Sequence, residues 1–318
     1  MRAPLTLHVL FGALALAGVP SRAGAQCTDG VDPAALALVA EGDAVVAVSV
    51  DAAIAKYEAA THLAPQAHAI WWKLARTYEK AERWQPMAKA CAAAAAAAER
   101  AEGARTHADY YFGQGHALEQ VAASALGTWA DARTPLETAI AIDPNLAEAY
   151  GELGWVSLHL DDDAGALQRW TTAIQKAPTE GRYYAWLADL YARLRKLDRA
   201  ERVLREGISL VAPDDREVYT LHSLLGGVLE ARGDAGGAVT EYEAAKAACA
   251  PDGCARHREA FFNVGKAYAR TRPPRKNEAT QNLQSFWKTT CKGASAQRFA
   301  DTCAEAQEIV RRVGGSLQ

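Results

Sequence analysis

Cysteine and histidine have the widest chemical range of the side chains in this sequence, and they number six and eight among 318 residues. A catalytic site needs a nucleophile, a positioned base and a group that stabilises charge. The histidines are scattered, and none stands at a spacing that would pair it with a reactive Ser or Cys. Haem-attachment spacings, phosphate-binding loops and dinucleotide-binding motifs do not occur in the sequence. We therefore predict that the protein is not an enzyme and has no cofactor.

One short segment has the composition of a zinc site, because thiolate and imidazole both bind zinc. It contains Cys249, Cys254 and His257. A fourth ligand is not evident, and the two cysteines can instead be oxidised to a disulfide. We therefore predict no metal site and keep a metal-binding protein as a distant alternative.

The six cysteines form an even set, which is typical of disulfides in an exported protein. Cys249 and Cys254 enclose Ala-Pro-Asp-Gly, a turn sequence that can bring its ends together. Cys291 and Cys303 flank a Lys-Gly-Ala-Ser junction between two helical stretches, where a bridge between helices is reasonable. The remaining pair would be Cys27 with Cys91, although Cys91 also occupies a core-facing helical position that suits a free buried thiol.

Residues 1–25 have the pattern of a secretory signal peptide. Arg2 gives the positive start, Leu5 to Val19 give an apolar run too short to span a bilayer, and small residues lead up to cleavage near Ala25. No later stretch is long and apolar enough to span a membrane, and Gln26 before Cys27 disfavours a lipid anchor. We expect a periplasmic or secreted protein with no transmembrane segment, for which peripheral association with the cell envelope stays open.

The charge of the chain argues against nucleic acid as a partner. Loss of Arg2 and Arg22 with the signal peptide changes the formal net charge from −3 to −5. Binding to phosphate groups requires a concentrated basic surface. We therefore predict no nucleic-acid binding.

The helices that would position any site are predicted by a sequence repeat of about 34 residues. One copy opens with the large residue Tyr150. Later copies open at Tyr184, His222 and Phe261, and similar residue types recur in them at the same spacings, which we call the repeat columns. In the first copy the columns are Tyr150, Leu153, Gly154, Ala166, Trp170, Ala173 and Pro178. An earlier copy is Trp71, Leu74, Ala75, Tyr78, Met87, Cys91 and Ala94. Small residues let two antiparallel helices approach, large ones fill the space beside them, and proline ends the second helix.

This pattern resembles the tetratricopeptide repeat over residues 34 to 290. The resemblance implies an all-α protein, an α-solenoid of about six to seven antiparallel helix pairs, some degenerate, whose stacking leaves a concave groove. A short segment, 26–33, precedes the array. Residues 291–318 are expected to form a C-terminal capping helix and tail, with the amphipathic helix over Ala294 to Val313 covering the end of the stack.

The resemblance also implies which residues line the groove, because the first helix of each pair does so in that family. The matching positions combine aromatic side chains with several charged ones, which suits an extended peptide with apolar anchors and an acidic group. They are Trp72, Arg76, Lys80, Phe112, His116, Trp155, His159, Arg182, Asp189, Arg193, Glu230, Phe262, Lys266 and Arg270. Each also has a purely structural interpretation: Trp72 as core, and the arginines as solvated or paired with acids.

The sequence therefore predicts an adaptor or scaffold that binds a peptide or protein partner in its concave groove, outside the cytoplasm. The alternative is an envelope assembly factor for outer-membrane, secretion or pilus machinery. An adaptor should be released with the soluble periplasm or the medium, whereas an assembly factor should sediment with the envelope. An enzyme is the third and most distant class.

Overall fold

The computed structural model describes residues 30–249, 254–292 and 296–317, and within these ranges the regular secondary structure is entirely helical. The first eight helices are α1 (Pro33–Val45), α2 (Val50–Leu63), α3 (His68–Lys80), α4 (Trp84–Glu102), α5 (Ala108–Ala123), α6 (Trp129–Ile142), α7 (Ala147–His159) and α8 (Asp163–Lys176). The others are α9 (Gly181–Arg193), α10 (Leu197–Leu210), α11 (Val218–Ala231), α12 (Ala235–Cys249), α13 (Glu259–Arg270), α14 (Lys276–Phe286), a π-helical turn η2 (Trp287–Cys291) and α15 (Ala300–Val313). The predicted all-α class is confirmed.

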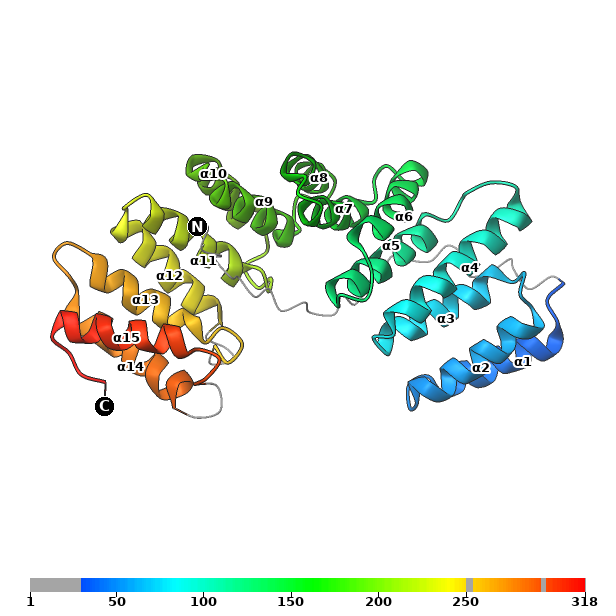
Figure 1. Ribbon diagram of the computed structural model, residues 1–318, viewed down its shortest axis with the longest axis horizontal. Coiled ribbons are helices and arrows are strands. Elements are labelled where there is room, and N and C mark those ends of the chain that lie inside the picture. Colours follow the sequence, from blue (N-terminus) through cyan, green and yellow to red (C-terminus); the bar gives the residue numbers. More distant parts are fainter. Residues whose placement is uncertain (1–29, 250–253, 293–295, 318) are drawn as a thin grey trace.

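Each odd-numbered helix from α1 to α13 packs against the even-numbered helix that follows it, and each pair packs against the next. The pairs together form an arch, with α7 to α10 at its crown and α1–α2 and α13–α15 at its two ends (Figure 1). The first helices of neighbouring pairs also contact each other, as α3 does α5, α5 does α7 and α9 does α11. We call the first helices of the pairs the inner row: at the crown, α7 and α9 lie on the inner side of the arch, and α6, α8 and α10 lie on its outer side (Figure 1).

Close approach within a pair depends on glycine at the helix contact. A Cβ atom on Gly154 of α7 would lie 2.3 Å from Nε1 of Trp170 on α8. That indole nitrogen donates a hydrogen bond of 3.0 Å to the carbonyl oxygen of Gly151, and the ring is 1% exposed. The repeat columns predicted from the sequence thus meet as expected, since a small residue on one helix makes room for an aromatic ring on its partner.

The turn inside several pairs uses one left-handed residue. Glu82, Asp161 and Arg195 have φ between 53° and 59°, and Gly233 has φ of 84° at the corresponding place, two residues beyond the first helix. Only glycine adopts this conformation without strain from its side chain. After Asp161, the side chain of Asp162 accepts a hydrogen bond of 2.9 Å from the backbone of Gly165 and so caps α8.

The C-terminal end of the array is covered as predicted. Helix α15 packs its apolar side against α13 and α14, where Phe286 and Ile309 are buried. It begins at Ala300, six residues later than the expected Ala294, because residues 296–299 form a turn. A disulfide joins Cys291 at the end of η2 to Cys303 on α15.

The cysteine predictions have different outcomes. The disulfides Cys249–Cys254 and Cys291–Cys303 are both present. Cys27 lies outside the described residues, as does the predicted signal peptide, while Cys91 is a free thiol that is 0% exposed in the core. Burial also raises the pKa of the Cys91 thiol strongly, so this thiol is in its neutral, unreactive form.

Candidate binding surface

The inner row of first helices carries the residues that the repeat pattern assigned to a groove, but they differ in exposure. Lys80, His159, Arg193 and Arg270 are exposed, and most of the others are partly buried. Phe112, His116 and Phe262 are only 4%, 5% and 6% exposed. These three side chains pack in the interior and do not contribute to the open surface.

At the N-terminal end of the row, Arg76 lies between an acid and an aromatic ring. Its Nη1 donates a hydrogen bond of 2.7 Å to Oε2 of Glu79, and its guanidinium lies 5.8 Å from the centre of the Trp72 ring. Trp72 in turn contacts Tyr110 of α5, with ring centres 5.1 Å apart. Trp72 is therefore part of the contact between pairs as well as of the inner surface, and Arg76 is held by its own neighbours.

The crown of the arch concentrates aromatic side chains from α7 and α9. The ring centres of Trp155 and Trp186 are 5.4 Å apart in an edge-to-face contact, and both rings are partly exposed. His159, one turn after Trp155, stacks on Trp129 of α6 with ring centres 3.7 Å apart. We call Trp155, His159, Trp186 and Arg193 the central aromatic surface.

Charged groups flank the central aromatic surface. Burial raises the pKa of Asp189, and the guanidinium of Arg193 opposes this effect. Burial and the same guanidinium lower the pKa of His159. Arg182 pairs with Glu180 at 2.9 Å and lies over the ring of Tyr183, 5.0 Å from its centre. Arg193 is thus the exposed cation of this region, whereas Arg182 is already held by an acid and a ring.

The C-terminal end of the row is largely neutralised by ion pairs. Glu230 of α11 pairs with Arg270 of α13. Lys266 of α13 pairs with Glu305 of the capping helix at 2.9 Å. Three of the predicted groove residues are therefore engaged with one another or with α15, and this end has less free charge to offer a ligand than the crown.

Beneath the inner row lies a group of buried ionisable side chains that the sequence analysis missed. Nδ1 of His116 lies 3.3 Å from Oε1 of Glu152, and both residues are less than 9% exposed. Glu119 is 1% exposed, and its Oε2 atom has no hydrogen-bond partner in the described part of the chain. We call His116, Glu119 and Glu152 the buried triad.

Burial and mutual interactions shift the pKa values of the three groups of the buried triad. Burial raises the pKa of Glu119 well above its usual range, with the charge of Glu152 adding to the effect. Burial also disfavours ionised Glu152, but the charge of His116, the hydrogen bonds from Glu119 and His116 and the charge of Arg182 together outweigh it and hold the pKa of Glu152 well below its usual range. Burial lowers the pKa of His116, whereas Glu152 more than reverses this. These shifts together favour a protonated histidine beside a carboxylate and a neutral carboxylic acid.

Two signals in the sequence could have found these acids. Glu119 stands eight residues beyond Tyr111, as Glu79 does beyond Trp71, so the same inward column holds an acid in two successive pairs. Glu152 stands two residues beyond Tyr150, a column that the groove pattern does not use. Both were missed because a glutamate on an amphipathic helix is normally assigned to the solvated side.

Within the described part of the chain, three groups of side chains have the composition of a metal site, and one of them is excluded. Cys249 and Cys254 are joined in a disulfide, so they offer no thiolates for a zinc ion with His257. The buried triad and a second group, His68, Glu102 and His107, each bring three possible ligand atoms within 4.8 Å of one another. The triad is fully enclosed, whereas the second group lies at the surface of the molecule.

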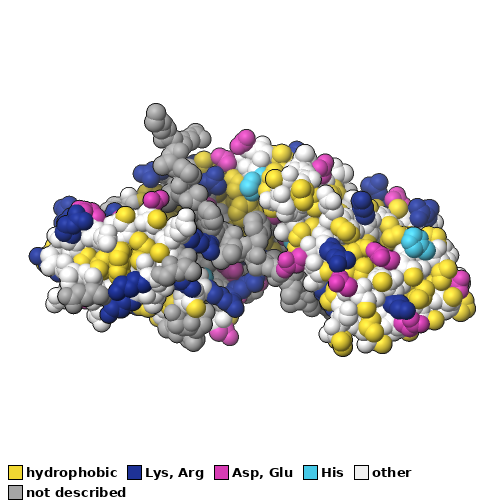
Figure 2. Space-filling view, turned by 60° about the horizontal axis from the view of Figure 1, so that its bottom comes forward, with side chains coloured by type: hydrophobic (Ala, Val, Ile, Leu, Met, Phe, Trp, Pro, Cys, Tyr) yellow, Lys and Arg dark blue, Asp and Glu magenta, His cyan; other side chains and the backbone are white. Residues whose placement is uncertain are grey.

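On the face that Figure 2 shows, Lys and Arg side chains are interspersed with Asp, Glu and apolar side chains. Among the described helices, none combines the length and the apolar character that crossing a membrane requires.

No protein family model matches the sequence, and no curated protein matches it. Solved structures do match the fold. The C-terminal part of a TPR repeat-containing protein from Cytophaga hutchinsonii superposes with a TM-score of 0.60 at 15% identity, covering 83% of this chain and 97% of that one. A tetratricopeptide repeat protein from Parabacteroides merdae gives 0.58 at 14% identity, covering 86% and 99%. In the APC/C hetero-tetramer Cut9–Hcn1, the match gives 0.51 at 19% identity, covering 73% and 42%.

The molecule is thus an α-solenoid of stacked helix pairs closed by a C-terminal helix. More particularly, it has the tetratricopeptide-repeat fold, as the repeat columns of the sequence predicted.

Proposed function

We propose that this chain is a scaffold that binds an extended peptide or a protein partner on the inner row of its arch. The observation that carries the proposal is the central aromatic surface, where the partly exposed rings of Trp155 and Trp186 meet and the exposed Arg193 interacts electrostatically with His159. Tryptophan and arginine are the side chains that contribute most to protein interfaces. The partner expected from this chemistry has an apolar side chain for the rings and an acidic group for the cation.

The proposal extends to the compartment, which we place in the periplasm or outside the cell. The two disulfides support it, because disulfides persist in oxidising compartments and are rare in the cytosol. The signal-like segment over residues 1–25 supports it from the sequence.

A charge-reversal experiment tests the binding surface. The double variant Lys80→Glu with Arg193→Glu changes two exposed first-helix residues. It should therefore weaken the binding of a partner that has an acidic group, without disturbing the core. The matched control is Lys89→Glu with Arg202→Glu, which reverses two exposed charges on the second helices of the same pairs, α4 and α10. After crosslinking and mass spectrometry, we expect the first variant to capture at least about tenfold less partner than the wild type, and the control to capture as much.

Equal capture by the two double variants would contradict the inner row as the binding surface. Unchanged helical circular dichroism in both variants shows that the loss is not due to unfolding. Cells should be fractionated before crosslinking, because wild-type protein found only in the cytosol would contradict the compartment while leaving the binding surface to be judged by the variants. Recovery with the envelope would favour an assembly factor over a freely released adaptor.

A further inference from the structure

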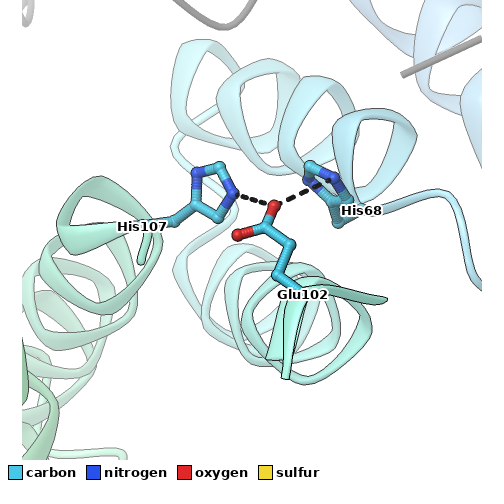
Figure 3. Close-up of side chains that lie close together, drawn as sticks. All are labelled: His68, Glu102 and His107. Carbon is cyan, nitrogen blue, oxygen red and sulfur yellow. Dashed lines mark hydrogen bonds and ion pairs between the residues drawn. The ribbon is translucent and has the colours of Figure 1, made fainter. Parts of the chain in front are cut away.

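Two histidines and a glutamate from different elements meet where α3, α4 and α5 come together (Figure 3). His68 is the first residue of α3, Glu102 is the last of α4, and His107 directly precedes α5. Nε2 of His107 lies 2.8 Å from Oε1 of Glu102, and Nε2 of His68 lies 3.9 Å from the same oxygen. Ligand atoms around a tetrahedral zinc ion lie roughly 3.3 Å apart, given bonds of about 2.0 Å. Small side-chain rotations would therefore bring these atoms to coordinating distance.

Neighbouring residues orient these ligands in the way that metal sites require. Nδ1 of His68 lies 2.9 Å from the hydroxyl of Tyr110, while Nε2 is the atom turned toward Glu102. The ring of His107 stacks on Tyr110, with centres 4.5 Å apart. The hydroxyl of Thr106 donates to Oε2 of Glu102, leaving Oε1 between the two imidazoles. Hydrogen bonds to the far side of each ligand fix its direction and its basicity.

Access and charge also suit a cation. The side chains of His68, Glu102 and His107 are 8%, 34% and 21% exposed, so an ion can reach the group from solvent. The carboxyl group of Asp109 interacts electrostatically with both histidines and adds negative charge beside them. The nearby cation Arg105 is directed to Glu99, at 3.4 Å.

We propose that His68, Glu102 and His107 bind a zinc ion or a similar divalent transition-metal ion. Two imidazoles and one carboxylate are a ligand set that such ions accept, and three protein ligands leave a position for water. The bound ion would tie the end of α4 to the starts of α3 and α5, and so would stabilise the junction between the second and third helix pairs. This site is separate from the central aromatic surface, and the two proposals can fail independently.

Titration with zinc tests the site. The full mature chain, treated with a chelator and dialysed, should bind one zinc ion in isothermal titration calorimetry, and zinc should raise its melting temperature. His107→Ala and Glu102→Gln each remove one ligand near the surface, so we expect at least about tenfold weaker binding and loss of the thermal shift. Cobalt provides a second readout, since its visible absorption bands should appear in the wild type and be lost in His107→Ala.

Two control variants make the outcome specific. His222 forms a similar pair with Glu241, at 2.7 Å, but lies outside the proposed site. His222→Ala should therefore leave zinc binding unchanged. Glu119→Gln tests the buried triad, which brings one imidazole and two carboxylates together. A wild-type chain that binds no zinc would overturn the proposal. So would unchanged affinity in His107→Ala, or zinc binding that is lost in Glu119→Gln and retained in His107→Ala.

Discussion

The buried triad would destabilise the fold if its charged groups were not paired. His116 and Glu152 lie 3.3 Å apart inside the core, where removing one partner of an ion pair leaves an unpaired buried charge. Burial raises the pKa of Glu119 and so disfavours a third charge in the group. Because His116 and Glu119 come from α5 and Glu152 from α7, the triad joins two successive helix pairs beneath the inner row.

The protonated state of Glu119 predicts a specific pH dependence of stability. Burial raises its folded-state pKa well above the ordinary 4.5. Above pH 4.5 the unfolded chain therefore loses a proton that the folded chain retains, and the unfolding free energy falls as pH rises toward the folded pKa, by up to about 1.4 kcal/mol per pH unit for this group. Glu119→Gln removes this loss. Urea unfolding should show the variant gaining on the wild type by about 1 kcal/mol or more between pH 5 and pH 8.

The control for this measurement is Glu137→Gln, which makes the same change at an exposed position on α6. Its stability relative to the wild type should stay level across the same pH range. Parallel pH profiles for Glu119→Gln and the wild type would show that Glu119 is ionised in the folded protein.

At the residue scale, the sequence predicts which residues occupy the repeat positions better than it predicts how exposed their side chains are. Trp155 and His116 both stand five residues after the large residue that opens their repeat, yet Trp155 is partly exposed on the inner row whereas His116 is buried. Exposure depends on how adjacent pairs meet, and no single helix pattern contains that information. Similarly, His68 and His107 lie 39 residues apart and meet only because two first helices stand side by side.

At the scale of the elements, the helices and turns follow closely from local sequence. The closing prolines Pro144 and Pro178 each stand two residues after the end of α6 or α8, because proline cannot supply the backbone N–H that would continue a helix. The Asp-rich turn before α8 contains its N-cap, Asp162. Such signals act over a few residues, which explains why the hairpins could be predicted without knowledge of the tertiary structure.

The left-handed turns give a prediction for two neighbouring glycines. Gly233 has φ of 84° and no atom close to the position of an added Cβ, so Gly233→Ala should cost about 1 kcal/mol of unfolding free energy through backbone strain alone. Gly236 is an exposed residue of α12 whose added Cβ would meet an atom only at 3.7 Å. Gly236→Ala should therefore stabilise by about 0.5 kcal/mol, because alanine favours the helix.

Urea denaturation of both alanine variants checks this contrast. The two substitutions add the same methyl group three residues apart, so opposite signs can only reflect the local backbone conformation. Equal effects of the same sign would indicate that Gly233 does not hold the left-handed conformation in solution.

At the scale of the whole molecule, the arch is a linear array in which each helix pair contacts mainly its neighbours. In such arrays, stability is the sum of the pairs and of the contacts between adjacent pairs, so the terminal units are the most easily opened. This chain reinforces its C-terminal end with α15 and with the Cys291–Cys303 disulfide. The sequence predicted both features, because an amphipathic helix and two cysteines flanking a junction are local signals.

The disulfide should therefore protect one end of the arch more than the rest. The double variant Cys291→Ser with Cys303→Ser removes a cross-link between residues that are 12 positions apart, and so increases the conformational entropy of the unfolded chain. This should cost about 2–3 kcal/mol of unfolding free energy. Because the array is linear, native-state hydrogen exchange should accelerate in α14 and α15 while α3 to α8 keep their wild-type rates. Cys249→Ser with Cys254→Ser is the control, since it should shift the acceleration to α12 and α13. Uniform acceleration from α3 to α15 would instead show that the whole arch opens as one cooperative unit.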